Sequence, residues 1–354
     1  MRVTLGDVCE KGASNIKQSD IANMTGEYPI YGAAGYIGNV DFYHQEKPYV
    51  AIVKDGAGIG RTTLHPAKSS VIGTMQYLLP KDNVLPEYLC YVVRHMHLEK
   101  YFTGATIPHI YFRDYKNEKL NLDSLDKQAE IIEILGKAES IILKRRKELA
   151  ELDNLIKARF VELFGDPILN QKQFPVYRMD EVVEFQGGSQ PDKKFFEYEP
   201  TDDNIRLIQI RDYKTDKFIT YIPRAMAKRF CTADDIMIGR YGPPIFQILQ
   251  GIEGSFNVAL MKATPKKGNK EFVRQFLKQE CLLDYLEGMS KRTAGQDGIQ
   301  MDKLKAYPFP LPPVELQNQF EKFVNQVDKS KVAVQKSLDE AQLLFDSLMQ
   351  QYFG

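Results

Sequence analysis

The stretch "IIEILGKAESIILKRRKELAELDNLIKARFVEL", residues 131–163, decides the fold of this 354-residue chain. Its seam positions alternate in steps of three and four residues from Ile131 to Leu163. A mostly apolar seam that repeats every 3.5 residues on average is typical of a coiled-coil helix. With N-cap candidates at Asp123 and Ser124, the pattern predicts one helix of about 38 residues, roughly 57 Å long.

The same pattern returns at the end of the chain, in "FEKFVNQVDKSKVAVQKSLDEAQLLFDSLMQQY", residues 320–352. Each seam position there follows its counterpart by 189 residues, and both helices close on Phe-Gly. Two unrelated amphipathic helices would not share one offset. Charges at Arg145, Arg159 and Lys331 would weaken the seam but fix its register. The predicted coiled-coil seam contains Leu135, Ile142, Leu149, Ile156, Leu163, Val324, Leu338, Phe345 and Tyr352.

The segments between the helices are also duplicated. "YVAIVKDGAGIGRT" (49–62) and "DIMIGRYGPPIFQ" (235–247) align at an offset of 186 residues. Short apolar runs broken by Gly, Pro, Asn and Asp predict mixed, mostly β domains. We therefore predict an α+β chain with domain 1 at 1–122, a coiled-coil helix at 123–165, domain 2 at 166–312 and a second coiled-coil helix at 313–354.

Duplicated units usually pair about a two-fold axis. That symmetry would set the two helices antiparallel as a coiled coil, with pseudo-two-fold symmetry and one domain at each end. The expected molecule is a pair of globular domains held apart by a rigid helical spacer.

Composition places limits on function. The chain has 47 basic and 47 acidic residues, so any nucleic-acid binding must use local patches or partners. Its four cysteines are scattered without a C-x-x-C pair, which indicates neither a disulfide framework nor a zinc site. The N-terminus lacks a signal-peptide core and no apolar run approaches a membrane span, so we expect a cytoplasmic protein.

The glycine-rich turn invites a cofactor interpretation. A dinucleotide or methyl-donor loop needs a helix directly after the glycines. Here "RTTLHPAKSSV" follows, with β-branched Thr62 and Thr63 and then Pro66. The sequence therefore predicts a β-turn followed by a second strand, and no cofactor site on this chain.

Other catalytic patterns are incomplete. The "GPPI" step resembles the catalytic loop of amino-methylating enzymes, but Gly242 replaces its polar acceptor and Ile245 its stacking ring. Pro191-Asp192 followed by Asp212-Tyr213-Lys214 fits the loose pattern of Mg²⁺-dependent nucleases, which matches many sequences by accident. The histidines all lie in the first half, so no duplicated His site exists. We expect no catalytic residue and no metal.

In its order of elements the chain resembles, over essentially its whole length, the specificity (S) subunit of type I restriction-modification systems. The resemblance rests on two variable domains, each with a Φ-x-(K/R)-x-G-x-x-I turn and each followed by a long helix. Gln128 and Gln317, the "LPPVELQ" lead-in and the "LFGDP" step support it. At 354 residues the chain is compact for this family.

The resemblance implies a non-catalytic, sequence-specific DNA-binding subunit. Each variable domain would be a target recognition domain that reads one half of a bipartite, asymmetric sequence in double-stranded DNA. The helices would position two adenine methyltransferase (M) subunits, which bind S-adenosylmethionine, and restriction motor-nuclease (R) subunits would join them.

Chemistry suggests which side chains would contact DNA. Base edges and phosphates are contacted by Arg, Lys, Gln, Thr, Tyr and His on exposed turns. The candidates lie in the two glycine turns and in polar loops before the helix-leading segments. They are Lys54, Arg61, Thr106, His109, Arg240, Tyr241, Lys291, Arg292 and Gln296.

Two alternatives belong to other functional classes. A coiled-coil scaffold that binds proteins would show no DNA sequence preference when assembled with its partners. A self-contained DNA modification enzyme would carry a tightly bound methyl donor.

Overall fold

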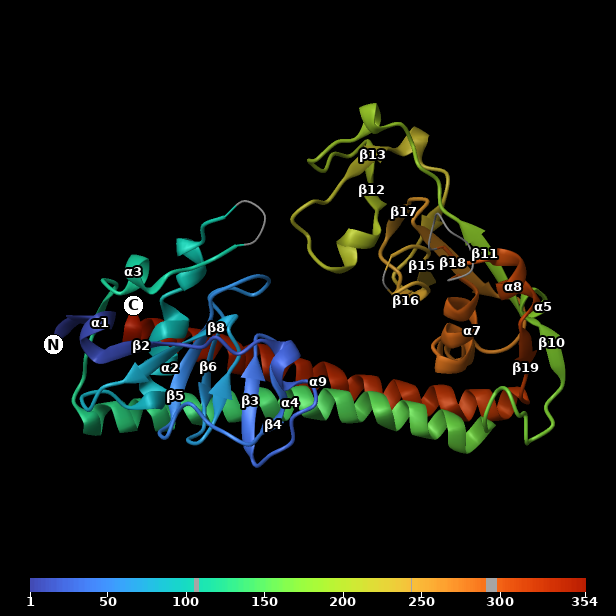
Figure 1. Ribbon diagram of the computed structural model, residues 1–354. Helices are drawn as coiled ribbons and strands as arrows, with labels where there is room; N and C mark the ends of the chain where they lie inside the picture. The colour runs from blue at the N-terminus through green and yellow to red at the C-terminus, as the bar shows by residue number, and fades with distance from the viewer. Residues whose placement is uncertain (105–107, 243, 291–297) are drawn as a thin grey trace. The chain divides into compact units, whose positions relative to one another are not determined.

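The computed structural model describes residues 1–104, 108–242, 244–290 and 298–354 (Figure 1). It divides into unit 1, Met1–Glu148 with Val334–Gly354, and unit 2, Leu149–Ala333. Two helices of 40 residues, α4 (Leu125–Phe164) and α9 (Val314–Phe353), each contribute one segment to each unit. At 1.5 Å per residue each is about 60 Å long. The predicted α+β class with two long helices is confirmed.

Unit 1 is built on a four-stranded antiparallel sheet of order β2-β8-β5-β6. Strand β5 is buried along its whole length, which explains its unbroken apolar sequence YVAIV. A second sheet has the order β4-β3-β7, with β3 and β7 parallel, and β1 pairs with β9. The strands are β1 (Arg2–Thr4), β2 (Cys9–Ala13), β3 (Tyr28–Gly32), β4 (Gly35–Val40), β5 (Tyr49–Val53), β6 (Thr62–His65), β7 (Ser70–Val71), β8 (Met75–Pro80) and β9 (Lys119–Asn121).

The main core of unit 1 joins this sheet to helix α2 and to the long helices. The shorter helices are α1 (Leu5–Val8), α2 (Pro86–His95) and α3 (Phe112–Tyr115), with 3-10 turns η1 (Gln18–Ile21) and η2 (Leu98–Tyr101). Ile131 near the start of α4 shares the core with Met349 near the end of α9. Further along, Arg145 Nε donates a 3.1 Å hydrogen bond to Ser337 Oγ. The two segments in unit 1 are therefore antiparallel.

Unit 2 repeats this plan with the sheet β11-β18-β15-β16 and a second sheet β13-β12-β17-β14, in which β12 and β17 are parallel. Strand β10 pairs with β19, as β1 pairs with β9. The strands are β10 (Val176–Arg178), β11 (Val183–Gly187), β12 (Asn204–Ile208), β13 (Tyr221–Pro223), β14 (Phe230–Cys231), β15 (Ile236–Gly239), β16 (Gln247–Gln250), β17 (Gly254–Phe256), β18 (Leu260–Pro265) and β19 (Pro308–Pro310).

The core of unit 2 is dominated by phenylalanines at the junction of α6 with the long helices. The rings of Phe160 and Phe320 meet edge to face with centroids 5.6 Å apart, and Phe272 stacks on Phe160 at 5.7 Å. Lys331 Nζ lies 2.5 Å from Asp153 Oδ1, so the two segments are antiparallel here as well. The shorter helices are α5 (Met179–Val182), α6 (Lys270–Leu277), α7 (Glu280–Ser290) and α8 (Met301–Ala306), with η3 (Lys193–Phe195), η4 (Ile210–Tyr213) and η5 (Arg224–Met226).

The predicted seam positions differ in burial. Five of them are buried, namely Leu135, Ile142, Ile156, Leu163 and Val324. The other four are half-buried, namely Leu149, Leu338, Phe345 and Tyr352. The charged positions keep polar partners, because Arg159 pairs with Glu162 and Lys331 with Asp153. These pairs let charged groups lie beside the seam without burying an unpaired charge.

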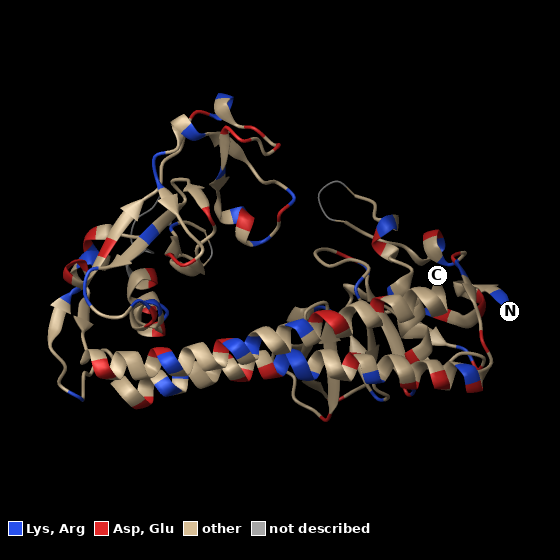
Figure 2. Ribbon diagram, turned by 180° about the vertical axis from the view of Figure 1, so that it is seen from behind, with Lys and Arg blue, Asp and Glu red and all other residues tan. Residues whose placement is uncertain are grey.

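Charged side chains occur along the whole of both long helices, and Figure 2 shows basic and acidic segments alternating on them. Several ion pairs are within one helix, such as Lys137 with Glu133. Within the described ranges, no helix combines the length and the apolar composition that crossing a membrane requires.

Candidate nucleic-acid interface

The first glycine turn is a β-hairpin turn between β5 and β6. Val53 and Arg61 pair across its base, with Val53 N donating to Arg61 O at 2.9 Å. Gly56, Gly58 and Gly60 have φ between +80° and +86°, a backbone conformation that residues other than glycine rarely adopt. A strand follows the turn, as predicted, and no helix begins there to hold a cofactor phosphate.

The segment that leads to α3 lies against this turn. Gly56 N donates to Pro108 O at 3.0 Å, and Asp55 and His109 form a β-bridge. His109 Nδ1 lies 2.6 Å from Asp55 Oδ1, and Lys54 Nζ lies 2.6 Å from Asp55 Oδ2. Burial raises the pKa of the Asp55 carboxyl, but the hydrogen bonds from Lys54 and His109 outweigh it and hold that pKa below its usual range. The carboxylate therefore fixes a cation and an imidazole at one point of the turn.

Two side chains that the sequence interpretation missed extend this group. The ring of Tyr111 stacks on His109 with centroids 6.3 Å apart, and the Arg113 guanidinium lies 4.9 Å from the Tyr111 centroid. Tyr111 is 45% exposed, which suits a side chain that stacks on a partner. Their positions beside His109 in the sequence were the available signal. Thr106, another predicted contact, lies outside the described residues.

Arg61 lies on the other side of the first turn and connects it to a neighbouring strand connection. Its Nη1 donates a 2.9 Å hydrogen bond to Ala33 O in the short connection between β3 and β4. The structure therefore brings Lys54, Arg61 and His109 together around one hairpin. We call this group, with Tyr111 and Arg113, the unit-1 turn surface.

The second glycine turn has the same position in unit 2, between β15 and β16. Arg240 N pairs with Ala259 O, and the Arg240 guanidinium lies 5.3 Å from the Tyr241 ring centroid. Tyr241 forms a β-bridge with Gly298, as Asp55 does with His109. Gly242 has φ +96°, and as a glycine it has no side chain that could accept a hydrogen bond from a target amine. Lys291, Arg292 and Gln296, predicted as contacts, lie outside the described residues, as does Pro243 of the Pro-Pro step.

The nuclease pattern does not assemble into a metal site. Asp192 accepts the backbone N–H of Lys194 at 3.1 Å and caps η3. Asp212 is buried and accepts the backbone N–H of Gln209. Within the part of the chain that the structure describes, no three His, Cys, Asp or Glu side chains are grouped so that they would hold a metal ion.

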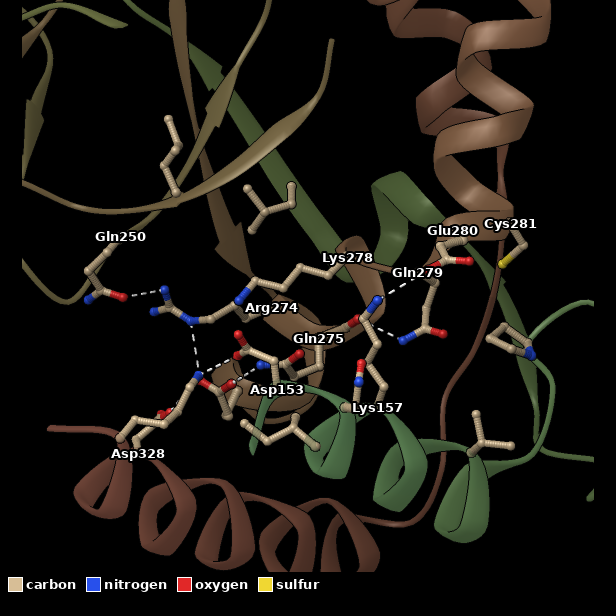
Figure 3. A pocket seen from close by; sticks show the side chains of 18 of the residues that line it. Asp153, Lys157, Gln250, Arg274, Gln275, Lys278, Gln279, Glu280, Cys281 and Asp328 are labelled. Atoms are coloured by element: carbon tan, nitrogen blue, oxygen red, sulfur yellow. Dashed lines mark hydrogen bonds and ion pairs between the residues drawn. The ribbon is translucent and has the colours of Figure 1, made fainter. Parts of the chain in front are cut away.

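Unit 2 also contains a hollow of about 980 Å³ beneath α6 (Figure 3). Most of its charges are paired, as Lys157 with Glu280 at 3.1 Å and Arg274 with Glu271 at 3.2 Å. Burial raises the pKa of Glu271 and lowers that of the Lys278 ammonium. These charge pairs supply a polar lining and no catalytic arrangement.

Larger side chains occupy the corresponding region of unit 1. Tyr91 of α2 lies against Phe345, with ring centroids 6.2 Å apart, and donates a 2.8 Å hydrogen bond to Glu139. By the repeat, Gln275 and Ile156 of unit 2 take the places of Tyr91 and Phe345. Both side chains are smaller than their counterparts, so the two units line this region differently.

Comparison with known proteins gives one consistent result. A family model described as the type I restriction modification DNA specificity domain matches residues 1–154 and 171–341. The chain is 21% identical over 318 residues to the type I restriction enzyme MjaVIII specificity subunit of Methanocaldococcus jannaschii, covering 79% of this chain and 72% of that protein.

One solved structure supports the fold. The S subunit of the type I restriction-modification system from M. genitalium aligns over 100% of this chain and 96% of that one, with a TM-score of 0.60 and 15% identity. The HsdS subunit from Thermoanaerobacter tengcongensis aligns over 100% and 96%, with a TM-score of 0.41 and 15% identity. Because the family model matches both repeats and nearly all of the chain, this protein belongs to the family of type I restriction-modification specificity subunits.

Proposed function

We propose that this chain reads a bipartite, asymmetric sequence in double-stranded DNA. As a specificity subunit it is a non-catalytic component of its restriction-modification complex. Unit 1 would read one half-site through the domain at 1–122, and unit 2 the other through the domain at 166–312. The two half-sites would be separated by a gap that the protein does not read.

The observation that carries this proposal is a repeated framework with different surfaces. Both units place a glycine turn on the third strand of a sheet of the same order. In unit 1 the turn carries Lys54 and Asp55, whereas Arg240 and Tyr241 occupy the matching places in unit 2. Base edges are distinguished by the donors and acceptors presented to them. Equal frameworks with unequal side chains favour two different half-sites.

Partner subunits would supply the chemistry. Exposed apolar residues on the long helices support a protein partner there, because burial of apolar surface favours protein association. They include Ile134, Ile141, Leu143, Leu155, Val332, Leu343 and Leu344. We propose that two adenine methyltransferase subunits dock on the helices and carry S-adenosylmethionine, and that R subunits join this cytoplasmic complex for restriction. The balanced net charge leaves much of the phosphate contact to these partners.

The test is a map of methylated adenines in cells that express this chain with its methyltransferase. We expect one bipartite motif whose half-sites differ. A palindromic motif would contradict the asymmetry. Methylation without sequence preference would favour a scaffold, and methylation by the purified chain alone would favour a self-contained enzyme.

A further inference from the structure

The two units differ sharply in one connection of the second sheet. Strands β3 and β12 correspond, because each pairs in parallel with the strand that follows the glycine-turn hairpin of its unit. β3 pairs with β7, and β12 pairs with β17. Residues 33–34 alone join β3 to β4, whereas residues 209–220 join β12 to β13. We call residues 209–220 the β12–β13 loop. It lies at the place where, in unit 1, Arg61 of the glycine turn touches Ala33.

The β12–β13 loop is ordered by hydrogen bonds of its own. The hydroxyl of Thr220, which is fully buried, accepts from Gln209 Nε2 at 3.0 Å and from Arg211 Nη2 at 3.1 Å. Lys217 N donates to Thr215 Oγ1 at 3.2 Å. A loop that is already ordered loses less conformational entropy when it binds a partner.

Asp212 lies close to two arginines, Arg206 of β12 and Arg211 of the loop itself. Its side chain is fully buried, and Gln209 N donates to Oδ2 at 3.2 Å. Arg206 Nε lies 3.6 Å from Oδ2 and Arg211 Nε lies 4.0 Å from Oδ1. These separations suit ion pairs but are too long for good hydrogen bonds. The carboxylate therefore neutralises the guanidinium groups without occupying their donors.

The outer side of the loop presents Arg211 beside an aromatic ring. The Arg211 side chain is 46% exposed, and its guanidinium lies 5.8 Å from the centroid of Phe218, which is itself 59% exposed. At the base of the loop, the Ile210 side chain packs against Gly239, directly before Arg240 and Tyr241 of the second glycine turn. The loop and the second turn are thus neighbours within unit 2.

We propose that Arg211 reads a guanine in the half-site recognised by unit 2, with Asp212 as its positioning residue. Arginine is the side chain that most often specifies guanine, through two parallel hydrogen bonds to O6 and N7. That geometry needs a guanidinium fixed in orientation, which Thr220, Asp212 and the Phe218 ring provide. The proposal rests on the proposed DNA recognition and names one of its base contacts.

The test compares Arg211→Lys with wild type in the assembled methyltransferase complex. Lysine keeps the charge but loses the planar pair of donors. We expect discrimination at one G·C pair of one half-site to fall about 10- to 100-fold, with every other position retained. The retained half-site of unit 1 shows that the complex is assembled. Arg224→Lys is the matched control, since Arg224 is an exposed arginine of the same unit whose Nε donates to the Asp202 carbonyl, and we expect its motif to be unchanged.

An unchanged motif for Arg211→Lys would overturn the proposal, and so would a uniform loss of affinity at all sites, which indicates a phosphate contact. A wild-type complex without sequence preference would overturn the proposed function itself. Asp212→Asn then tests the positioning role. We expect it to relax the same G·C pair as Arg211→Lys, whereas a purely structural role would lower methylation at all sites without changing any letter of the motif.

Discussion

Gln128 and Gln317, which are 189 positions apart, make equivalent hydrogen bonds, each within its own unit. Oε1 of Gln128 accepts the backbone N–H of Leu85 at 2.8 Å, and Oε1 of Gln317 accepts that of Asn269 at 2.7 Å. Each acceptor thereby binds the N-cap residue of the helix that follows the first sheet, α2 or α6. Nε2 of each glutamine donates to the carbonyl five residues before it. Both glutamines are buried, so each fixes its domain to the first turn of a long helix.

Replacing either glutamine with methionine would leave buried backbone groups without partners. We expect Gln128→Met and Gln317→Met each to lower the free energy of unfolding by about 2–4 kcal/mol. Denaturant unfolding of the purified chain measures this. Gln335→Met is the matched control, because Gln335 is exposed on α9 and its Nε2 donates to Asp339 of the same helix. A loss no larger than the control's would show that these hydrogen bonds do not hold the domains.

Variants of the two glycine turns should alter different halves of the methylation motif. His109→Gln removes the imidazole that Asp55 holds, and Arg240→Ala removes a guanidinium in the matching place of unit 2. We expect each to weaken discrimination in one half-site about tenfold, since single base contacts contribute on the order of 1–3 kcal/mol. Mapping methylated adenines for both variants decides this. If both changed the same half-site, the division of labour between the units would be wrong.

Lengthening the helices tests whether they set the gap. Four residues inserted between Glu148 and Leu149, with four more between Ala333 and Val334, would lengthen the pair by about 6 Å. Coiled coils tolerate a four-residue insertion with slight unwinding. Base pairs are ~3.4 Å apart along each strand, so we expect the unread gap to grow by one or two base pairs. The methylation motif before and after insertion is the measurement, and altered half-site letters or a constant gap would count against the helices as the ruler.

His65 should make unit 1 less stable in mild acid. Its ring is buried and stacks on Tyr49, and burial lowers its pKa to about 4. The unfolded chain takes up a proton near pH 6.5, whereas the folded chain does so only near pH 4. The uncharged His65 ring therefore gives its full contribution to the free energy of unfolding above about pH 6.5. As pH falls through 4 that contribution is lost, and the free energy of unfolding drops by up to about 3 kcal/mol.

The measurement is the free energy of unfolding against pH for wild type and His65→Phe. Other acidic groups titrate in both proteins, so the difference between the two curves isolates His65. We expect that difference to change between pH 6.5 and 4. Parallel curves would show that His65 titrates equally in the folded and unfolded chains.

The sequence predicts best what is local or periodic. The helices follow from a seam that repeats along the chain, and the first turn follows from glycines between two strands. The hydrogen bonds of Gln128 do not follow from its position, because its partner Leu85 is 43 residues away in the chain. The resemblance singled out Gln128 and Gln317 without showing what they bind.

Part of the candidate interface could not be predicted for the same reason. The parallel pairing of β12 with β17 is non-local, and only that pairing shows residues 209–220 to be an added loop. Asp212 matched a nuclease pattern by residue type alone. Its burial between Arg206 and Arg211 gives it a different role, since the carboxylate is enclosed by protein.

The discontinuity of unit 1 affects how the protein is made. Unit 2 is one uninterrupted stretch, whereas the core of unit 1 needs Met349 and its neighbours near the end of α9. On the ribosome, unit 2 has its complete sequence before unit 1 does. Until translation reaches those last turns, the apolar faces of α2 and of the first half of α4 lack their cover, which leaves apolar surface exposed on the nascent chain during that interval.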